Sequence, residues 1–365
     1  MMPKDPRLPL TCFSWRQRVV YNFFQILDHF LGRPLVVKIF GNIRFRAFEK
    51  ISKSLKAKGN GNIIDIEYKT DLTEKEFKDY YLKRGIPVVL KGAANDWKSV
   101  KEWDLNYIKE LHGNDEVPII HAIDPTKGIE KSTLKELIDR LQSGDKTPYF
   151  RYYNLISQHP EHLADIDLDW IKKYVHKNRY FESFQAFLGG AGTRTELHNA
   201  HISNFFVQIE GTKEWILYPN YFVPFIDPPS TFNGIYRTTP IRAKGKPFNP
   251  FDPDFEGYPF FRYLDGYKVK LEAGDVLYNP PHMWHAVLNR TETIGLGFRW
   301  INMIDSFRTS PVYYMLDILA FKPFYLKALK MTKKDANQQF LYRFNKMKKK
   351  IEKQQKKTNM KHQSE

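Results

Sequence analysis

The spacing of hydrophobic residues changes twice along the chain. In the first sixty residues, apolar positions recur three and four apart, as between Arg18 and Leu27, which predicts one or two helices packed on the rest of the protein. From Tyr149 to about residue 303, short aromatic and β-branched runs alternate with Gly, Pro and Asn. Beyond Ser306 the helical spacing returns and then decays into a lysine-rich tail. We therefore expect a β-rich body between two helical extensions.

The middle runs predict a mainly β sandwich or barrel of the jelly-roll type. The expected strands cover residues 149–154, 183–188, 203–209, 214–218, 267–271, 276–278, 285–289 and 293–301. The segment from Asn220 to Asp265 is too long for a plain hairpin, and an insertion of that size beside a barrel mouth is a natural substrate lid. The predicted organisation is an N-terminal extension over 1–60, a domain over 61–305 with its barrel core over 149–303, and a tail over 306–365.

Helices are also expected before the barrel. Thr73 followed by Glu76 has the pattern of a helix N-terminus, with Thr73 as the N-cap and Glu76 at the third helical position. Residues 103–111 and 132–141 have helical spacing, the latter with Ser132 as the expected cap. The barrel is therefore predicted to follow a helix-rich segment.

The formal net charge of +16 is concentrated at the two ends. Residues 1–59 hold 12 Lys/Arg and 3 Asp/Glu, and residues 329–365 hold the same numbers, so each end carries +9 and the body between them carries −2. Solvated helices with a frayed tail explain such ends. The alternative is contact with a polyanion or with an anionic membrane surface. The neutral body argues against a simple nucleic-acid reader.

Cysteine content and apolar run length indicate the compartment. Cys12 is the only cysteine, so an intramolecular disulfide and a cysteine-rich zinc site are excluded. The longest apolar stretches are shorter than the ~18 to 20 residues of a spanning helix, and no cleavable signal peptide is evident. A cytoplasmic protein is expected.

Two separated segments contain the residues that could bind a metal. The first runs from Thr195 to Pro219 and includes His198, and the second runs from Gly274 to His285. A strand ending at His198 can place its imidazole at a barrel mouth, where a histidine at the start of a later strand reaches the same point. Two imidazoles and one carboxylate on one face of an octahedron leave three positions open, which is the arrangement of non-haem Fe(II) oxygenases.

The residues around both histidines resemble those of the JmjC/cupin-like hydroxylases, in particular the asparaginyl hydroxylase that acts on hypoxia-inducible factor. That family has Thr-x-x-His-x-Asp-x-x-x-Asn, then Gly-x-Lys and a strand ending in Pro; its second half is Gly-Asp-x-Leu-x-x-Pro followed by Trp-His. The resemblance covers roughly residues 65–303. The matching residues are Thr195, His198, Asn204, Gly211, Lys213, Pro219, Gly274, Asp275, Leu277, Pro280, Trp284 and His285.

The resemblance implies a double-stranded β-helix and assigns roles by position. His198 and His285 would hold iron, and Lys213 would pair with the distal carboxylate of 2-oxoglutarate. A lysine on an inward-facing strand is costly unless it meets an anion, which supports that role. Hydrogen bonds to this co-substrate are expected from three further residues, namely Thr195, Asn204 and Tyr149, with Tyr152 as an alternative to Tyr149.

Ala200 departs from the family pattern, because it stands where the family has the ligand Asp. One explanation is that iron remains and the vacant position takes water or chloride, as in 2-oxoglutarate-dependent halogenases. A second is that a neighbour substitutes, the candidates being His201, Glu196 and His282. The third is that metal binding has lapsed.

The leading hypothesis is therefore an Fe(II)- and 2-oxoglutarate-dependent dioxygenase-type oxidoreductase, with hydroxylation as its default outcome. A halogenase and a catalytically silent binding module are the alternatives. The substrate could be a protein, an RNA or a small molecule, since fold analogy cannot choose. The C-terminal helices could form a homodimer.

Overall fold

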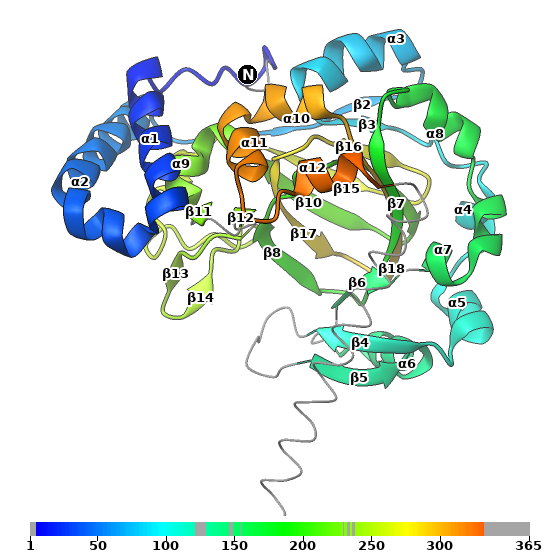
Figure 1. The fold of residues 1–365 in the computed structure, drawn as a ribbon. Coiled ribbons are helices and arrows are strands. Elements are labelled where there is room, and N and C mark those ends of the chain that lie inside the picture. Colours follow the sequence, from blue (N-terminus) through cyan, green and yellow to red (C-terminus); the bar gives the residue numbers. More distant parts are fainter. Residues whose placement is uncertain are drawn as a thin grey trace, which may run out of the picture.

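Two facing β-sheets form the centre of the structure (Figure 1). The computed structural model describes residues 5–120, 129–145, 149–153, 155–228, 230–231, 234–235 and 238–331. The small sheet contains, in order, β1 (Ile63–Asp65), β15 (Gly266–Leu271), β10 (Lys213–Tyr218), β17 (Trp284–Asn289) and β8 (Arg194–His198). The large sheet contains β2 (Glu67–Lys69), β3 (Val88–Leu90), β16 (Val276–Asn279), β9 (Ser203–Glu210), β18 (Thr293–Ile301), β7 (Tyr180–Gly189) and β6 (Tyr149–Tyr153).

The strands from β7 to β18 cross between the sheets in a jelly-roll pattern. β7, β9, β16 and β18 belong to the large sheet, whereas β8, β10, β15 and β17 belong to the small one. Neighbours within this set pair antiparallel, while β1 with β15 and β2 with β3 pair parallel, so both sheets are mixed. The predicted jelly-roll arrangement is thus present, and β8 ends at His198 as the sequence argument required.

Alternation along the strands separates the barrel interior from an outer layer. On β9, Phe206 packs between the sheets against Trp215 of the small sheet, whereas its neighbours Phe205 and Val207 face outward. The outer face of the large sheet is covered by short helices and a β4–β5 hairpin. These are α3 (Glu74–Glu76), the π-helix η1 (Phe77–Leu82), α4 (Lys98–Glu102), α5 (Leu105–His112), β4 (Glu116–Ile120), β5 (Ile129–Thr133), α6 (Leu134–Gln142), α7 (Leu155–Gln158), the 3₁₀-helix η3 (Pro160–Asp165) and α8 (Leu168–Tyr174).

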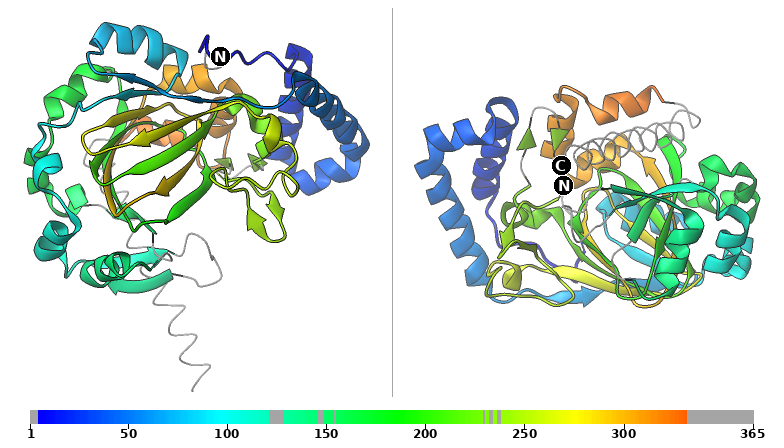
Figure 2. Two further views of the ribbon diagram at one scale, coloured as in Figure 1. Left: turned by 180° about the vertical axis from the view of Figure 1, so that it is seen from behind. Right: turned by 90° about the horizontal axis from the view of Figure 1, so that it is seen from below.

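The N-terminal extension is a helical hairpin made of α1 (Trp15–Leu31) and α2 (Arg33–Lys58). It lies on one side of the barrel, and α5 to α8 lie on the opposite side (Figure 2). The C-terminal extension contains α10 (Met303–Thr309), α11 (Pro311–Ile318) and α12 (Phe324–Leu329). With so much helix, the fold is mixed α and β, which corrects the expectation of a mainly β chain.

The insertion between β10 and β15 is partly structured. It contains the 3₁₀-helix η4 (Asn220–Phe222), α9 (Val223–Ile226), the strand pairs β11 (Ser230–Thr231) with β12 (Gly234–Ile235) and β13 (Arg242–Ala243) with β14 (Lys246–Pro247), and the 3₁₀-helix η5 (Phe261–Tyr263). An isolated β-bridge joins Thr238 of the insertion to His198. The insertion therefore touches the small sheet at the first candidate metal ligand.

The helix caps agree with the sequence in one case and differ by one residue in another. Thr73 accepts a hydrogen bond from the backbone N–H of Glu76, as expected. The second cap is Thr133 rather than Ser132, because the Thr133 hydroxyl accepts a hydrogen bond of 3.2 Å from the N–H of Glu136, whereas the Ser132 hydroxyl donates to the Glu136 carboxylate. Among the described helices, none is long and apolar enough to cross a membrane.

Candidate metal and co-substrate site

His198 and His285 are cross-strand partners on β8 and β17. The centroids of their rings lie 4.3 Å apart. Each Nδ1 lies close to a main-chain oxygen of its own strand segment, at 2.7 Å from the carbonyl of Glu196 and 2.9 Å from that of Met283. Such carbonyls hold the proton on Nδ1 and leave the lone pair on Nε2, which is how metal-binding histidines are commonly oriented. The structure thus brings the two residues together, and their metal-binding role stays a prediction.

Ala200 lies just beyond the end of β8. Its carbonyl accepts a hydrogen bond of 2.7 Å from the backbone N–H of His282. Its methyl group packs against the apolar cluster of Ile202, Tyr325 and their neighbours, which joins the end of the barrel to α12. This position therefore contributes apolar packing where the family pattern has a carboxylate.

The three candidate substitutes each have another contact. The Glu196 carboxylate forms an ion pair of 3.0 Å with Arg242 of the insertion. The His201 ring packs edge-on against His282 at 5.3 Å, and Nε2 of His282 lies 3.1 Å from the Tyr325 hydroxyl. These contacts give each of the three side chains a structural role in the fold. A role as the third metal ligand stays a prediction.

Lys213 begins β10 with its side chain inside the barrel. The residue is 0% exposed, and its amino group lies 4.8 Å from the centroid of the Phe206 ring. Burial lowers the pKa of Lys213 from 10.5 to about 7. Two residues further along the same face, Trp215 stacks on His285 with ring centroids 5.3 Å apart. Lys213 therefore faces the same interior as the histidine pair, where an anion would restore its charge.

The other residues expected to bind the co-substrate contact the main chain. The Thr195 hydroxyl accepts a hydrogen bond of 3.1 Å from the N–H of Val287, beside an irregularity in the β8–β17 pairing. Asn204 is buried, and its amide can donate to the carbonyls of Phe205 and Phe298 at 3.3 and 3.2 Å. The side chains of Tyr149 and Tyr152 lie outside the described residues.

Arg299 on β18 is a second interior cation that the sequence analysis missed. It is the cross-strand partner of Asn204, and its guanidinium lies 5.6 Å from the ring of Phe187. Gly297 keeps this space open, because a Cβ there would lie 3.0 Å from the side-chain amide of Asn204 and 3.2 Å from Phe187. The alternation of Gly295, Gly297 and Arg299 with large apolar residues could have signalled the interior face of this strand.

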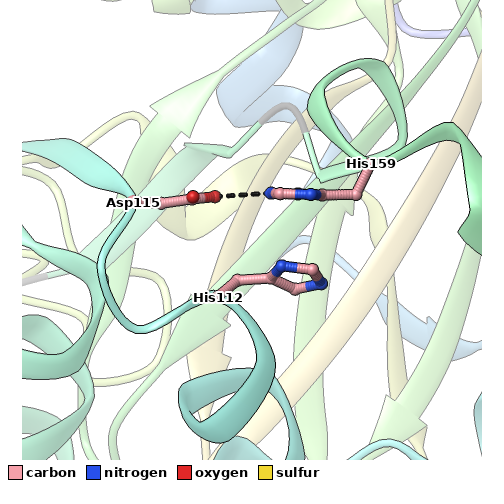
Figure 3. A group of neighbouring side chains, drawn as sticks. All are labelled: His112, Asp115 and His159. Carbon is pink, nitrogen blue, oxygen red and sulfur yellow. Dashed lines mark hydrogen bonds and ion pairs between the residues drawn. The ribbon is translucent and has the colours of Figure 1, made fainter.

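His112, Asp115 and His159 form a second group that could hold a metal ion (Figure 3). One ligand atom from each lies within 4.8 Å of the others. Nε2 of His159 is 2.8 Å from Asp115, whose carboxylate also accepts a hydrogen bond of 2.7 Å from the Tyr153 hydroxyl. Nε2 of His112 lies 2.8 Å from Nε2 of His162. The group therefore has the donor atoms for a divalent cation, and one hydrogen bond already joins Asp115 to His159 within it.

This second group lies outside the barrel. Its helices α5 and α7 pack Ile108 and Leu155 into the outer cluster that also contains Leu188 of β7, whereas Phe187 faces the interior. The group and Lys213 therefore lie on opposite faces of the large sheet. Sequence reasoning missed the group because its members come from two segments far apart in the chain, joined only by the fold.

The chain is similar in sequence to proteins of known families. Residues 73–306 match the family model described as "Cupin-like domain". The chain is 26% identical over 237 residues to Jumonji C domain-containing protein 5 of Drosophila melanogaster, covering 62% of this chain and 57% of that protein. It is 27% identical over 250 residues to lysine-specific demethylase JMJ30 of Arabidopsis thaliana, with coverages of 66% and 56%. The chain thus spans just over half the length of both.

A third relative is covered more completely. The bifunctional peptidase and (3S)-lysyl hydroxylase JMJD7 of Homo sapiens is 25% identical over 263 residues, covering 64% of this chain and 82% of that protein. These similarities support the broader resemblance to JmjC and cupin-like proteins. The narrower likeness to the asparaginyl hydroxylase stays a prediction.

Proposed function

This chain belongs to the cupin-like domain family, and on that premise we propose that it is an Fe(II)- and 2-oxoglutarate-dependent oxidoreductase with its site inside the barrel. The observation that carries the proposal is the pairing of His198 with His285 beside Lys213 on the neighbouring strand. Hydroxylation is the default outcome, because one similar protein is named a hydroxylase and another a demethylase.

Of the three protein ligands expected for iron, the chain supplies two, His198 and His285. The carbonyl oxygens beside both Nδ1 atoms favour the tautomer in which Nε2 carries the lone pair that a metal requires. Ala200 supplies no donor, so the third position is left to water, chloride or a neighbouring side chain. Bound Fe(II) with 2-oxoglutarate would supply the oxidising chemistry that functionalises an unactivated C–H bond.

Lys213 would bind the distal carboxylate of 2-oxoglutarate. The amino group is desolvated, and its pKa of about 7 rises again when a carboxylate binds beside it. Arg299 is a second cation on the opposite wall and could hold an anionic group of the co-substrate or substrate. The buried aromatic rings around Lys213 limit water, which strengthens its attraction for an anion.

The insertion would close over the same mouth as a lid. Arg242 pairs with Glu196, and Thr238 forms a β-bridge with His198, so insertion residues lie directly beside one metal ligand. The substrate would be a protein, an RNA or a small molecule. We expect residues between Asn220 and Asp265 to determine which substrate is bound.

The two alternatives that follow from Ala200, a halogenase and a silent binding module, predict different reaction products. A halogenase would require chloride for its product, and would shift toward hydroxylation in Ala200→Asp. A silent binding module would form no succinate from 2-oxoglutarate with any substrate. The outer group of His112, Asp115 and His159 belongs to neither scheme, because the large sheet separates it from Lys213.

Succinate formation with Fe(II), 2-oxoglutarate and O₂ tests the proposal. His198→Ala and His285→Ala should abolish turnover, while the matched variants His112→Ala and His159→Ala should retain it. Loss of turnover only in the second pair would place the metal in the outer group. Absence of succinate from the wild-type protein, across peptides, RNA and small acids, would favour the silent module.

A further inference from the structure

The α1–α2 hairpin exposes an apolar stripe on the side facing away from the protein. On α1 the exposed apolar residues recur three and four apart, so they lie on one face. The stripe consists of Trp15, Val19, Phe23, Ile26 and Phe30, and α1 also exposes Val20 and Leu31 beside it. Trp15 is 70% exposed and Phe23 52%. The buried residues Tyr21, Phe24 and Asp28 lie on the opposite face, so this stripe is additional to the one that anchors the helix.

The exposed face of α2 continues this surface and adds positive charge. Leu35, Ile39 and Ile43 follow one another at helical spacing on its first half, and Arg46, Lys50 and Lys53 occupy the same face further on. Across residues 15–58, all of which are described, the exposed cations are Arg16, Lys38, Arg46, Lys50, Lys53 and Lys56. The exposed acid in that range is Glu49, because Asp28 is buried.

A groove between the two helices combines both properties. Its volume is about 400 Å³. Val20, Ile43 and Ile51 give it an apolar lining, and Arg16, Arg46 and Lys50 contribute three cations to the same lining. An amphiphile with an anionic head and an apolar tail matches this combination, because the phosphate can meet the cations while the chain contacts the apolar lining.

The hairpin is fixed to the body of the protein. Arg33 pairs with Asp227 of the insertion at 2.8 Å and with Asp28 at 2.9 Å, and Arg44 also reaches Asp28 at 2.7 Å. The Tyr21 hydroxyl donates to the carbonyl of Val223 at 3.3 Å. The outward stripe therefore has a set orientation relative to the barrel, as a docking platform requires.

The charge on this face decides among possible occupants. Residues 329–365 hold 12 Lys/Arg against 3 Asp/Glu, so the chain's own C-terminal part carries the same sign. A second copy would bring an identical basic face. A nucleic acid would satisfy the cations and leave the Val, Ile and Phe stripe in water. An anionic lipid surface accommodates both the apolar stripe and the cations.

We propose that the α1–α2 hairpin docks this protein on anionic membranes. The outward stripe of α1 enters the boundary between headgroups and acyl chains, and the groove cations bind a headgroup phosphate. The hairpin lies on the membrane surface, because neither of its helices is long and apolar enough to cross a membrane. This inference is independent of the chemistry in the barrel.

Sedimentation of the full-length protein with vesicles tests the proposal. Vesicles of phosphatidylcholine with about one third phosphatidylserine should retain the protein, and pure phosphatidylcholine should retain far less, with binding falling as salt rises. The triple variant R16Q/R46Q/K50Q should bind the anionic vesicles about 100-fold more weakly. Lys268→Gln with Lys270→Gln on β15 removes exposed charge elsewhere and should bind like wild type.

The apolar half of the proposal has its own readout. V19S/F23S changes exposed residues and should lower vesicle binding while the circular dichroism spectrum stays native. Trp15 fluorescence should shift to shorter wavelength with anionic vesicles, and the shift should vanish in Trp15→Phe. Equal binding to both vesicle types, or unchanged binding by V19S/F23S, would overturn the proposal. So would tight RNA binding without vesicle binding, or a dimer in solution that V19S/F23S dissociates.

Discussion

His198 and His285 are partners in the β8–β17 ladder, with ring centroids 4.3 Å apart and each Nδ1 beside a carbonyl of its own segment. Main-chain pairing therefore assembles the two imidazoles, and neither contact involves the side chain at position 200. A chain that has lost the family's carboxylate can keep this pair in place. If the pair binds a metal as proposed, water, chloride or a neighbouring side chain would complete its coordination.

Lys213→Met should stabilise the protein and weaken 2-oxoglutarate binding. Burial disfavours the charged amino group, so an apolar side chain of similar volume should raise the free energy of unfolding at pH 7 by about 2–4 kcal/mol. Chemical denaturation and calorimetric titration measure the two effects. Lys270→Met on the exposed face of β15 is the control and should change neither. A destabilised Lys213→Met that still binds 2-oxoglutarate would show that the lysine is a structural residue.

Binding of 2-oxoglutarate should take up a proton above neutral pH. The pKa of Lys213 is lowered to about 7, so at pH 8 most of the folded protein carries the neutral amine, and a bound carboxylate favours the ammonium form. Affinity should therefore fall as pH rises from 7 to 9, by up to about tenfold per unit. Calorimetry in two buffers of different ionisation enthalpy measures the uptake, which should disappear in Lys213→Met. Release of a proton would contradict the role.

Ala200→Asp should make stability depend on metal. A carboxylate placed beside Ile202 and Tyr325 is desolvated, which should destabilise the metal-free protein by about 1–3 kcal/mol. Fe(II) should recover this loss if the new carboxylate reaches the metal, and thermal unfolding with and without anaerobic Fe(II) measures the recovery. Ala200→Asn is the matched control with weaker expected recovery. Equal melting temperatures for Ala200→Asp in both conditions would mean that position 200 faces away from the metal.

The sequence predicted the barrel because its strands have a strong local signal. Runs such as 203–209 and 293–301 combine β-branched and aromatic residues between turn residues, and both became central strands. It also brought His198 and His285 together, through two motifs whose flanking residues agree with one family. The share of helix was underestimated, since short helices such as α4 and α7 have too few residues for a periodic pattern.

Two features depend on pairing between distant segments. The alternation along β18 signals which face Arg299 occupies, but its place opposite Asn204 comes from the register of β18 with β9. His112 and His159 are 47 positions apart in the numbering and stack with ring centroids 3.6 Å apart once α5 and α7 pack together. Both depend on tertiary pairing, which local periodicity does not encode. At position 200 the sequence alone shows that the family's ligand Asp is replaced by Ala. It does not show which group, if any, takes the place of that ligand.

The most direct test of a barrel metal site is anaerobic titration with Fe(II) and 2-oxoglutarate, following the weak visible absorption band of the chelated complex. The wild-type protein should give one equivalent of this band, and His112→Ala with His159→Ala should leave it unchanged. His198→Ala with His285→Ala should abolish it, and Lys213→Met should raise the 2-oxoglutarate concentration needed. No band in the wild-type protein, or a band that survives loss of both barrel histidines, would contradict the proposed site.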